Sequence, residues 1–314
     1  MFFNKNNKNI IIITGATGSG KSSFALKLAQ KINGVIINAD SMQIYKQIPI
    51  ISAQPSEIEK TNIKHYLYGF VDIFSKNKYS VGEYLLDLKN ILEKIDKKKE
   101  QKIPIIVGGT MLYISSILSG LSEIPEISDD IKNNIRIKYK NKTAEEMFDE
   151  LKKVDAKYAK IVDKNNPHRI LRGLEVKLST GLSIIDFWNK KKQKSLLENY
   201  NVKKIIIDTQ RDELYERINR RFDEMLKNNV LDEVRQIYNY ATDKKINIQS
   251  IPIAIGLHEF FKYFDKKISM EATVDKIKQL SRNYAKRQLT WHKKYFHDFE
   301  KIKNNFDTNN IMLY

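Results

Sequence analysis

Cysteine is absent from all 314 residues of this sequence. The chain therefore forms no disulfide bond and offers no thiolate ligand to a metal ion. Its five histidines do not have the spacing of a zinc-binding motif such as H-E-x-x-H. These absences argue against a disulfide-stabilised secreted domain and against a transition-metal site. We expect a cytoplasmic protein.

Long hydrophobic runs are also missing. No apolar stretch approaches the roughly 20 residues that a membrane-spanning helix needs. The opening segment, MFFNKNNKN, has no apolar core before the first expected strand, so it does not resemble a secretory signal. We expect no membrane partner.

Acidic residues are scarce relative to basic ones. The chain has 38 Asp and Glu against 55 Lys and Arg, which gives a formal net charge of +17. A basic surface favours polyanions such as nucleic acids, through phosphate contacts and the release of counterions. A compositionally biased genome that overuses Lys, Asn and Ile would produce the same charge, so the charge alone leaves nucleic-acid binding open.

The distribution of apolar residues divides the chain into three parts. Residues 1–120 alternate short Ile/Val runs with amphipathic segments, which predicts an α/β fold with a parallel sheet buried on both faces. Residues 121–200 are highly charged, have helical periodicity and contain no strand-like run, so we expect a helical insertion. Residues 201–314 open on KKIIIDT, a further strand of the sheet, and continue as helices.

The segment GATGSGKS directly after the first apolar run fits the phosphate-binding pattern G-x-x-x-x-G-K-[ST]. It consists of Gly15, Ala16, Thr17, Gly18, Ser19, Gly20, Lys21 and Ser22. Its glycines allow backbone N–H groups to converge on phosphate oxygens, and the following helix adds positive potential. Lys21 is expected to neutralise the outer phosphate and Ser22 to ligate Mg²⁺. Such loops most often hold ATP or GTP, but the motif does not specify which diphosphate is bound.

Two carboxylates end apolar runs and are candidates for the chemistry. Asp40 follows GVIINA, and Asp208 ends the run IIID. Since the carboxyl ends of parallel strands line the ligand crevice of an open sheet, Asp40 is expected near the phosphate loop. A lone Asp at a strand end is also a common turn cap. Asp208 is the candidate for Mg²⁺ binding if the protein is a kinase or an NTPase.

Several motifs occur in the order seen in one enzyme family. GATGSGKSS, INADSMQIY, VGGTMLYI, HRILRGLEV and SRNYAKRQLTW together resemble the tRNA dimethylallyltransferases, also called tRNA isopentenyltransferases. The resemblance covers nearly the whole chain and is most specific at Asp40-Ser41-x-Gln43 and at Tyr284–Trp291. Departures from the family pattern include Ala16 in place of Pro and Met42 in place of Arg.

The resemblance implies a P-loop NTPase-like core with an all-helical insertion domain that contacts the tRNA anticodon stem-loop. It implies transfer of a dimethylallyl group from dimethylallyl pyrophosphate to the exocyclic amine of the adenine 3′-adjacent to the anticodon. Mg²⁺ is the implied cofactor, and we expect a monomer. Asp40 is the expected general base, because an adenine amine is a poor nucleophile unless a proton is removed as it attacks.

The same resemblance assigns further residues. Thr17 is expected to hydrogen-bond Asp40 or the phosphates, Arg221 to bind pyrophosphate, and Gln43 to pair bidentately with adenine. HRILR places Arg169 and Arg172 on one helical face that the family uses against tRNA. The expected tRNA contacts are Asp40, Ser41, Met42, Gln43, Thr110, His168, Arg169, Ile170, Leu171, Arg172, Arg282 and Lys286.

Three alternatives remain open from the residues. An adenylate isopentenyltransferase shares the loop and the Asp-Ser pair, but has less use for a long basic helical insertion. A P-loop kinase or NTPase would use Asp208 for Mg²⁺. A non-catalytic RNA-binding protein has no need to combine Lys21, Ser22 and Asp40.

Overall fold

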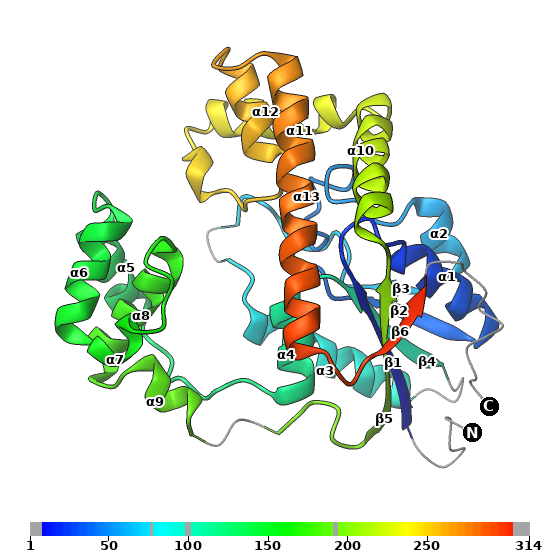
Figure 1. The fold of residues 1–314 in the computed structure, drawn as a ribbon, viewed down its shortest axis with the longest axis horizontal. Helices are drawn as coiled ribbons and strands as arrows, with labels where there is room; N and C mark the ends of the chain where they lie inside the picture. The colour runs from blue at the N-terminus through cyan, green and yellow to red at the C-terminus, as the bar shows by residue number, and fades with distance from the viewer. Residues whose placement is uncertain (1–7, 76–77, 98–101, 191–193, 304–314) are drawn as a thin grey trace. The chain divides into compact units, whose positions relative to one another are not determined.

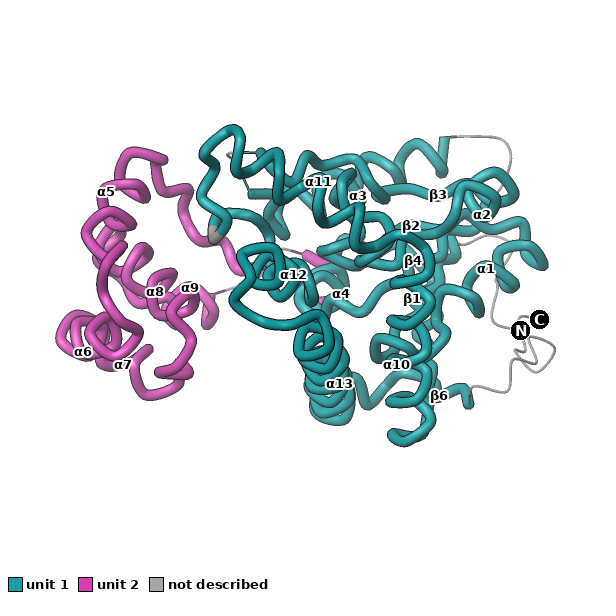
Figure 2. Tube along the Cα trace, turned by 90° about the horizontal axis from the view of Figure 1, so that it is seen from above, with its two compact units in different colours: residues 1–118, 196–314 teal, residues 119–195 magenta. Residues whose placement is uncertain are grey.

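The computed structural model of this protein describes residues 8–75, 78–97, 102–190 and 194–303. The chain divides into two units, each described here by itself (Figure 2). The first unit contains residues 1–118 and 196–314, and the second contains residues 119–195.

The first unit is built on a parallel sheet, which the described residues form with six strands in the order β3-β2-β4-β1-β5-β6. The strands are β1 (Lys8–Gly15), β2 (Gly34–Asn38), β3 (His65–Tyr66), β4 (Ile103–Gly108), β5 (Tyr200–Asp208) and β6 (Glu300–Lys303). Every pairing is parallel, and β1 lies between β4 and β5. The parallel α/β core predicted from the sequence is confirmed, including the late strand at KKIIID.

Helices cover both faces of this sheet (Figure 1). They are α1 (Lys21–Lys31) on one face and α3 (Val81–Lys97) and α4 (Met111–Ser119) on the other. Successive side chains of a strand point to opposite faces. Ile11 and Ile13 of β1 therefore pack with α1, and Ile10 and Ile12 pack with α3 and α4. All four are fully buried, which is why β1 reads as an uninterrupted apolar run.

A second core of the same unit lies among its later helices. These are α10 (Arg211–Lys227), α11 (Val230–Asp243), α12 (Leu257–Phe264) and α13 (Met270–Tyr295). Phe222, Phe260 and Ile277 belong to this core, together with Ile44 and Ile48 of the segment after β2. The helices α10 and α13 lie side by side (Figure 1). This second core fixes the position of the segment that follows Asp40.

The second unit is helical throughout the part of it that the structure describes. Its helices are α5 (Asp129–Tyr139), α6 (Ala144–Val154), α7 (Ala156–Ala159), α8 (Pro167–Thr180) and α9 (Ile184–Trp188). Leu151, Ile170 and Leu174 form the centre of its own core and are fully buried. Within the described residues of the whole chain, no helix is both long enough and apolar enough to cross a membrane.

The ends of β4 and β2 approach each other at Gly108. A Cβ atom on Gly108 would lie 2.1 Å from the carbonyl oxygen of Ala39, which is backbone and has no freedom to move aside. Only glycine permits this approach, and the approach brings the residues after β2 beside those after β4.

We therefore expect Gly108→Ala to lower the free energy of unfolding by about 3 kcal/mol or more, because the added methyl group forces the strands apart. Gly82→Ala is the matched control, since Gly82 is in α3 and its nearest neighbour, Ser80 Oγ, is 3.6 Å from the added atom. Removing a helical glycine should stabilise the protein by about 0.5–1 kcal/mol. Denaturant titration measures both, and a Gly108→Ala protein as stable as the control would contradict the close approach.

A buried histidine lies where α13 meets β1. His292 is 6% exposed, and its Nε2 lies 3.5 Å from Thr14 Oγ1. Its Nδ1 is buried without a partner. Burial, with a smaller contribution from the charge of Lys21, lowers the pKa of His292 to about 4. The folded protein therefore holds this ring neutral at neutral pH.

This depressed pKa makes stability depend on pH in a defined window. Above the ordinary pKa of 6.5 the ring is neutral in both states, whereas between 6.5 and about 4 only the unfolded chain binds the proton. Stability should thus fall as the pH is lowered through this window, by about 1.4 kcal/mol per pH unit from this group. His292→Phe should unfold with a shallower pH dependence than the wild type. Parallel stability curves for the two proteins would contradict the assignment.

Candidate active site

The phosphate loop joins β1 to α1. Gly18 and Gly20 adopt positive φ angles of 82° and 86°, which residues with a side chain rarely adopt. Ser19 N donates to Ala16 O (3.0 Å), which closes the turn. The loop therefore has the strand-turn-helix context that the motif requires, with Ser22 exposed in the first turn of α1.

Two cations converge on this loop. Arg221 of α10 donates from Nη2 to Thr17 Oγ1 (2.8 Å), and its Nε is buried with no hydrogen-bond partner among the described residues. Burial lowers the pKa of both Lys21 and Arg221, to about 8 for Lys21, while the charge of Asp40 opposes the shift. Cations that have lost water and retain an unpaired donor are suited to bind an anion. Thr17 was expected to hydrogen-bond Asp40 or the phosphates, and in this structure its hydroxyl contacts Arg221.

Asp40 lies just beyond β2 in a defined orientation. Its Oδ1 accepts from Met42 N (2.9 Å), and its own N–H donates to Asn38 Oδ1 (2.8 Å). Asn38 is completely buried and also donates from Nδ2 to Asp40 O and to Leu67 O, both at 2.9 Å. Among the described residues none donates a hydrogen bond to Asp40 Oδ2. One carboxylate oxygen is therefore fixed and the other is available to accept a proton.

Thr110 connects the ends of β2 and β4. Its Oγ1 accepts from Ser41 N (2.9 Å) and donates to Ser41 Oγ (3.2 Å), and its N–H donates to Ala39 O (3.2 Å). Ser41 follows Asp40 directly in the chain, and the side chains of Ser41 and Thr110 are both half-buried. In this structure Thr110 orients Asp40-Ser41, in addition to any contact that it makes with a substrate.

Three tyrosines interact electrostatically with Asp40, and no role was expected for any of them. Burial and the negative charge of Asp40 both raise the pKa of Tyr68, Tyr113 and Tyr284. They come from the segment after β3, from α4 and from α13. Tyr113 and Tyr284 lie in the motifs VGGTMLYI and SRNYAKRQLTW, but no spacing marks any of the 16 tyrosines of the chain for this position. α13 also brings Gln288 to the phosphate loop, another contact that the sequence did not reveal.

In the segment after Asp40, the side-chain amide of Gln43 binds the backbone of a later turn. Gln43 Nε2 donates to Ser52 O (3.0 Å) and to Ala53 O (2.7 Å), which uses both of its N–H groups. Bidentate pairing with adenine would require Gln43 to give up one of these two contacts, and the expectation that Gln43 reads the base stays a prediction. The amide holds a turn in which Ala53 has a φ of 55°, a left-handed conformation that costs a non-glycine residue roughly 1–2 kcal/mol.

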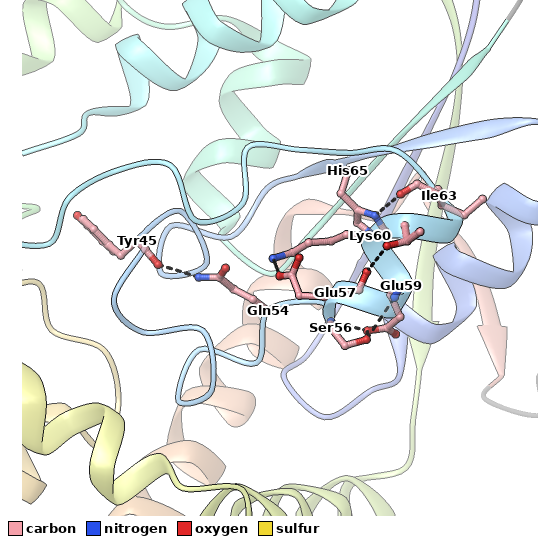
Figure 3. Close-up of polar contacts among 9 residues, drawn as sticks. Tyr45, Gln54, Ser56, Glu57, Glu59, Lys60, Ile63 and His65 are labelled. Carbon is pink, nitrogen blue, oxygen red and sulfur yellow. Dashed lines mark hydrogen bonds and ion pairs between the residues drawn. The ribbon is translucent and has the colours of Figure 1, made fainter.

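Further local bonds hold the same segment (Figure 3). Gln54 Nε2 donates to Tyr45 O (2.8 Å). Ser56 and Glu59 form a capping box at the start of α2 (Glu57–Asn62). Met42, where the family pattern has Arg, packs against the second core. These contacts fix the conformation of the segment, which holds Asp40 and Ser41 at the carboxyl edge of the sheet.

The other carboxylate candidate, Asp208, ends β5. Ile207 is in register with Gly15, so Asp208 lies beside the start of the phosphate loop, and its side chain is exposed. No group of three or more His, Asp or Glu side chains that could hold a metal ion is found among the residues with described positions.

The five residues expected to contact tRNA in the second unit begin α8. His168 and Arg169 are exposed, whereas Arg172 donates from Nη1 to Glu175 Oε2 (3.4 Å). Leu171 is partly buried against the core of the unit. The side chain of Ile170 is fully buried in that core, and the expected contact of this residue with tRNA stays a prediction.

In the first unit, α13 carries the two remaining basic candidates. Lys286 is exposed, and Arg282 is half-buried and donates from Nη1 to Asn219 Oδ1 (2.8 Å). The exposed amine of Lys286 is free to approach a phosphate without breaking a contact recorded in the structure. Arg282 has a second role in joining α13 to α10.

Known proteins resemble this chain in sequence and in structure. Residues 43–295 match the family model described as IPP transferase. The tRNA dimethylallyltransferase of Pelagibacter ubique is 42% identical over 283 residues, which cover 90% of this chain and 87% of that protein. The enzyme of Ehrlichia chaffeensis is 37% identical and covers 95% of this chain and 98% of that protein.

Solved structures agree with these matches. A eukaryotic dimethylallyltransferase described as acting on tRNA has a TM-score of 0.79 at 28% identity, covering 96% of this chain and 76% of that one. A tRNA isopentenylpyrophosphate transferase from Staphylococcus epidermidis has a TM-score of 0.63 at 33% identity, covering 95% and 94%. The chain therefore belongs to the IPP transferase family, the family of the tRNA dimethylallyltransferases.

Proposed function

We propose that this protein transfers a dimethylallyl group from dimethylallyl pyrophosphate to the exocyclic amine of the adenine 3′-adjacent to the tRNA anticodon. The observation that carries the proposal is the placement of Asp40 beside a phosphate loop that holds two desolvated cations, Lys21 and Arg221. The names of the relatives, which specify tRNA and dimethylallyl transfer, support the choice of both substrates.

The cations are suited to a pyrophosphate leaving group. As the bond between the allyl carbon and the pyrophosphate oxygen breaks, negative charge develops on that oxygen. Lys21, the unpaired Nε of Arg221 and the amides that follow Thr17 in the loop then stabilise the charge. Because these groups are already in place, their reorientation adds little to the barrier.

Ser22 is the residue that would hold Mg²⁺, a cation that prefers oxygen ligands and retains several waters. Its hydroxyl oxygen lies at the exposed start of α1, and the remaining ligands would be pyrophosphate oxygens and water. This assignment agrees with the lack of a cluster of acidic or histidine ligands among the described residues. When bound, the metal would supply further neutralisation of the leaving group.

Asp40 is the proposed base. Its Oδ1 is held by Met42 N–H, which leaves Oδ2 to accept a proton from the adenine amine. The amine nitrogen forms a bond to the allyl carbon, the carbon–oxygen bond to pyrophosphate breaks, and Asp40 takes the proton that the nitrogen loses. Thr110 and Asn38 maintain the orientation of Asp40 through their contacts at the ends of β2 and β4.

We further propose which surfaces meet the tRNA. In the first unit these are Asp40, Ser41, Met42, Thr110, Arg282 and Lys286, and in the second His168, Arg169, Leu171 and Arg172. The accessible polar atoms of His168, Arg169 and Lys286 favour phosphate or sugar contacts. Thr17, Lys21, Asp40 and Arg221 come from one chain, so we propose a monomeric enzyme. We also propose a cytoplasmic location, because its proposed substrate is tRNA.

The base assignment predicts a large and selective loss of activity in Asp40→Asn. Transfer of a labelled dimethylallyl group to tRNA should fall by about 10²–10⁴-fold, the usual contribution of a general base. Asp208→Asn is the matched control, since Asp208 also ends a strand next to the loop but has no assigned role here. If Asp208→Asn were the inactive protein, and the wild type turned over ATP without a prenyl donor, the kinase or NTPase alternative would replace this proposal. Labelling of AMP in place of tRNA would favour an adenylate isopentenyltransferase.

The lowered pKa of Lys21 predicts how donor binding depends on pH. The amine is charged below about pH 8 and loses its charge above it, so the affinity for the donor should fall as the pH rises through 8. At saturating tRNA, the KM for dimethylallyl pyrophosphate should rise by up to about tenfold per pH unit above that value. Lys21→Arg keeps its charge at these pH values and should show a flatter profile, whatever its overall activity. Identical profiles for the two proteins would rule out this role for Lys21.

A further inference from the structure

One face of α13 is directed at the catalytic edge of the sheet. Tyr284, Gln288 and His292 are spaced by four residues, which places them on one side of the helix. The charge of Asp40 acts on Tyr284, Gln288 contacts the phosphate loop, and His292 lies beside Thr14 of β1. Gln288 is the only one of the three that contacts the loop backbone in the described structure.

The carboxamide of Gln288 joins two segments that are far apart in sequence. Its Oε1 accepts from Thr17 N (2.7 Å), and its Nε2 donates to Gly109 O (2.9 Å). The side chain is 2% exposed, so these partners replace water almost completely.

Gly109 is shaped to receive this side chain. A Cβ atom on Gly109 would lie 2.5 Å from Gln288 Nε2 and 3.6 Å from Lys21 Nζ. The turn after β4, the phosphate loop and α13 thus meet at one point, and the lack of a side chain on Gly109 makes room for the amide. Each residue of the pair Gly108-Gly109 has its own reason to lack a side chain. A side chain on Gly108 would collide with Ala39, and one on Gly109 would collide with Gln288.

Thr17 is restrained from two directions. Gln288 binds its backbone N–H, and Arg221 binds its side-chain hydroxyl. The Thr17 N–H is therefore not among the amides that point at a phosphate, and the loop is held by contacts outside itself. This matters because a loop rich in glycine has many alternative conformations, and only a fraction of them would present the amides correctly.

We propose that Gln288 is a positioning residue, which clamps Thr17 of the phosphate loop to Gly109 and thereby sets the affinity of the loop for pyrophosphate. The inference rests on the proposed function, in which this loop holds the pyrophosphate of the donor. It assigns to α13 a role on the donor side of the reaction, separate from any contact of its exposed face with RNA.

Gln288→Met tests the clamp, since methionine has a similar volume and length but neither donates nor accepts a comparable hydrogen bond. Binding of inorganic pyrophosphate with Mg²⁺, measured by calorimetry, should weaken by roughly tenfold, the effect of losing a net hydrogen-bond contribution. The KM for dimethylallyl pyrophosphate should rise similarly, while tRNA binding in a filter assay should stay within about twofold. Gln279→Met, on the exposed side of the same helix, should behave as wild type.

A double-mutant cycle separates the clamp from a general loss of structure. Gly109→Ala displaces the amide from the opposite side, so combining it with Gln288→Met should weaken pyrophosphate binding no more than the worse single change. Additive effects, unchanged pyrophosphate binding in Gln288→Met, or loss of tRNA binding alone would overturn the clamp. Lys21→Ala reports on the underlying proposal: if the wild type bound pyrophosphate no better than Lys21→Ala, the proposed donor site itself would fail.

Discussion

The structure depends on the parallel pairing of β1 with β4 and of β4 with β2. Parallel register brings the ends of these strands to one edge, where Gly15, Asn38 and Gly108 lie. The phosphate loop follows β1, Asp40 lies just beyond β2, and Thr110 lies just beyond β4. A one-residue slip in either pairing would turn apolar side chains toward the wrong layer of helices and would separate the base from the loop.

Charge at this edge is balanced among few groups. Lys21 and Arg221 are largely removed from water, and the carboxylate of Asp40 is the nearest negative charge that offsets them. Leaving Arg221 Nε buried and unpaired costs free energy, which an anionic ligand would recover. The proposed site therefore has two separate parts: Lys21 and Arg221 bind an anion, and Asp40 accepts a proton.

Some elements of this fold and site could be predicted from the sequence, and others could not. β1 and the phosphate loop were predictable, because an apolar run buried on both faces and a glycine-rich loop leave direct signatures. β3 and β6 were not, since a two-residue strand and the polar segment EKIK carry no such pattern. The local contacts of Gln43 and Ile170 were not predictable for another reason: a motif does not reveal that a turn 10 residues away takes both amide protons of Gln43, or that a core takes the Ile170 side chain. Tyr68, Tyr113 and Gln288 reach the site only through tertiary packing, which single-sequence patterns do not contain.

The order of the strands along the chain also constrains how the protein folds during synthesis. β1 pairs with β5 from Lys8↔Tyr200 to Gly15↔Ile207, so a central strand has one neighbour that is made after the whole helical unit. At about 5–20 residues per second, the ribosome needs roughly 10–40 seconds between them. During that interval β1 presents an unpaired apolar edge, while the helical unit, which has its own hydrophobic core, can already fold. The insertion thus delays completion of the sheet, and the nascent core is the part of this protein most exposed to aggregation.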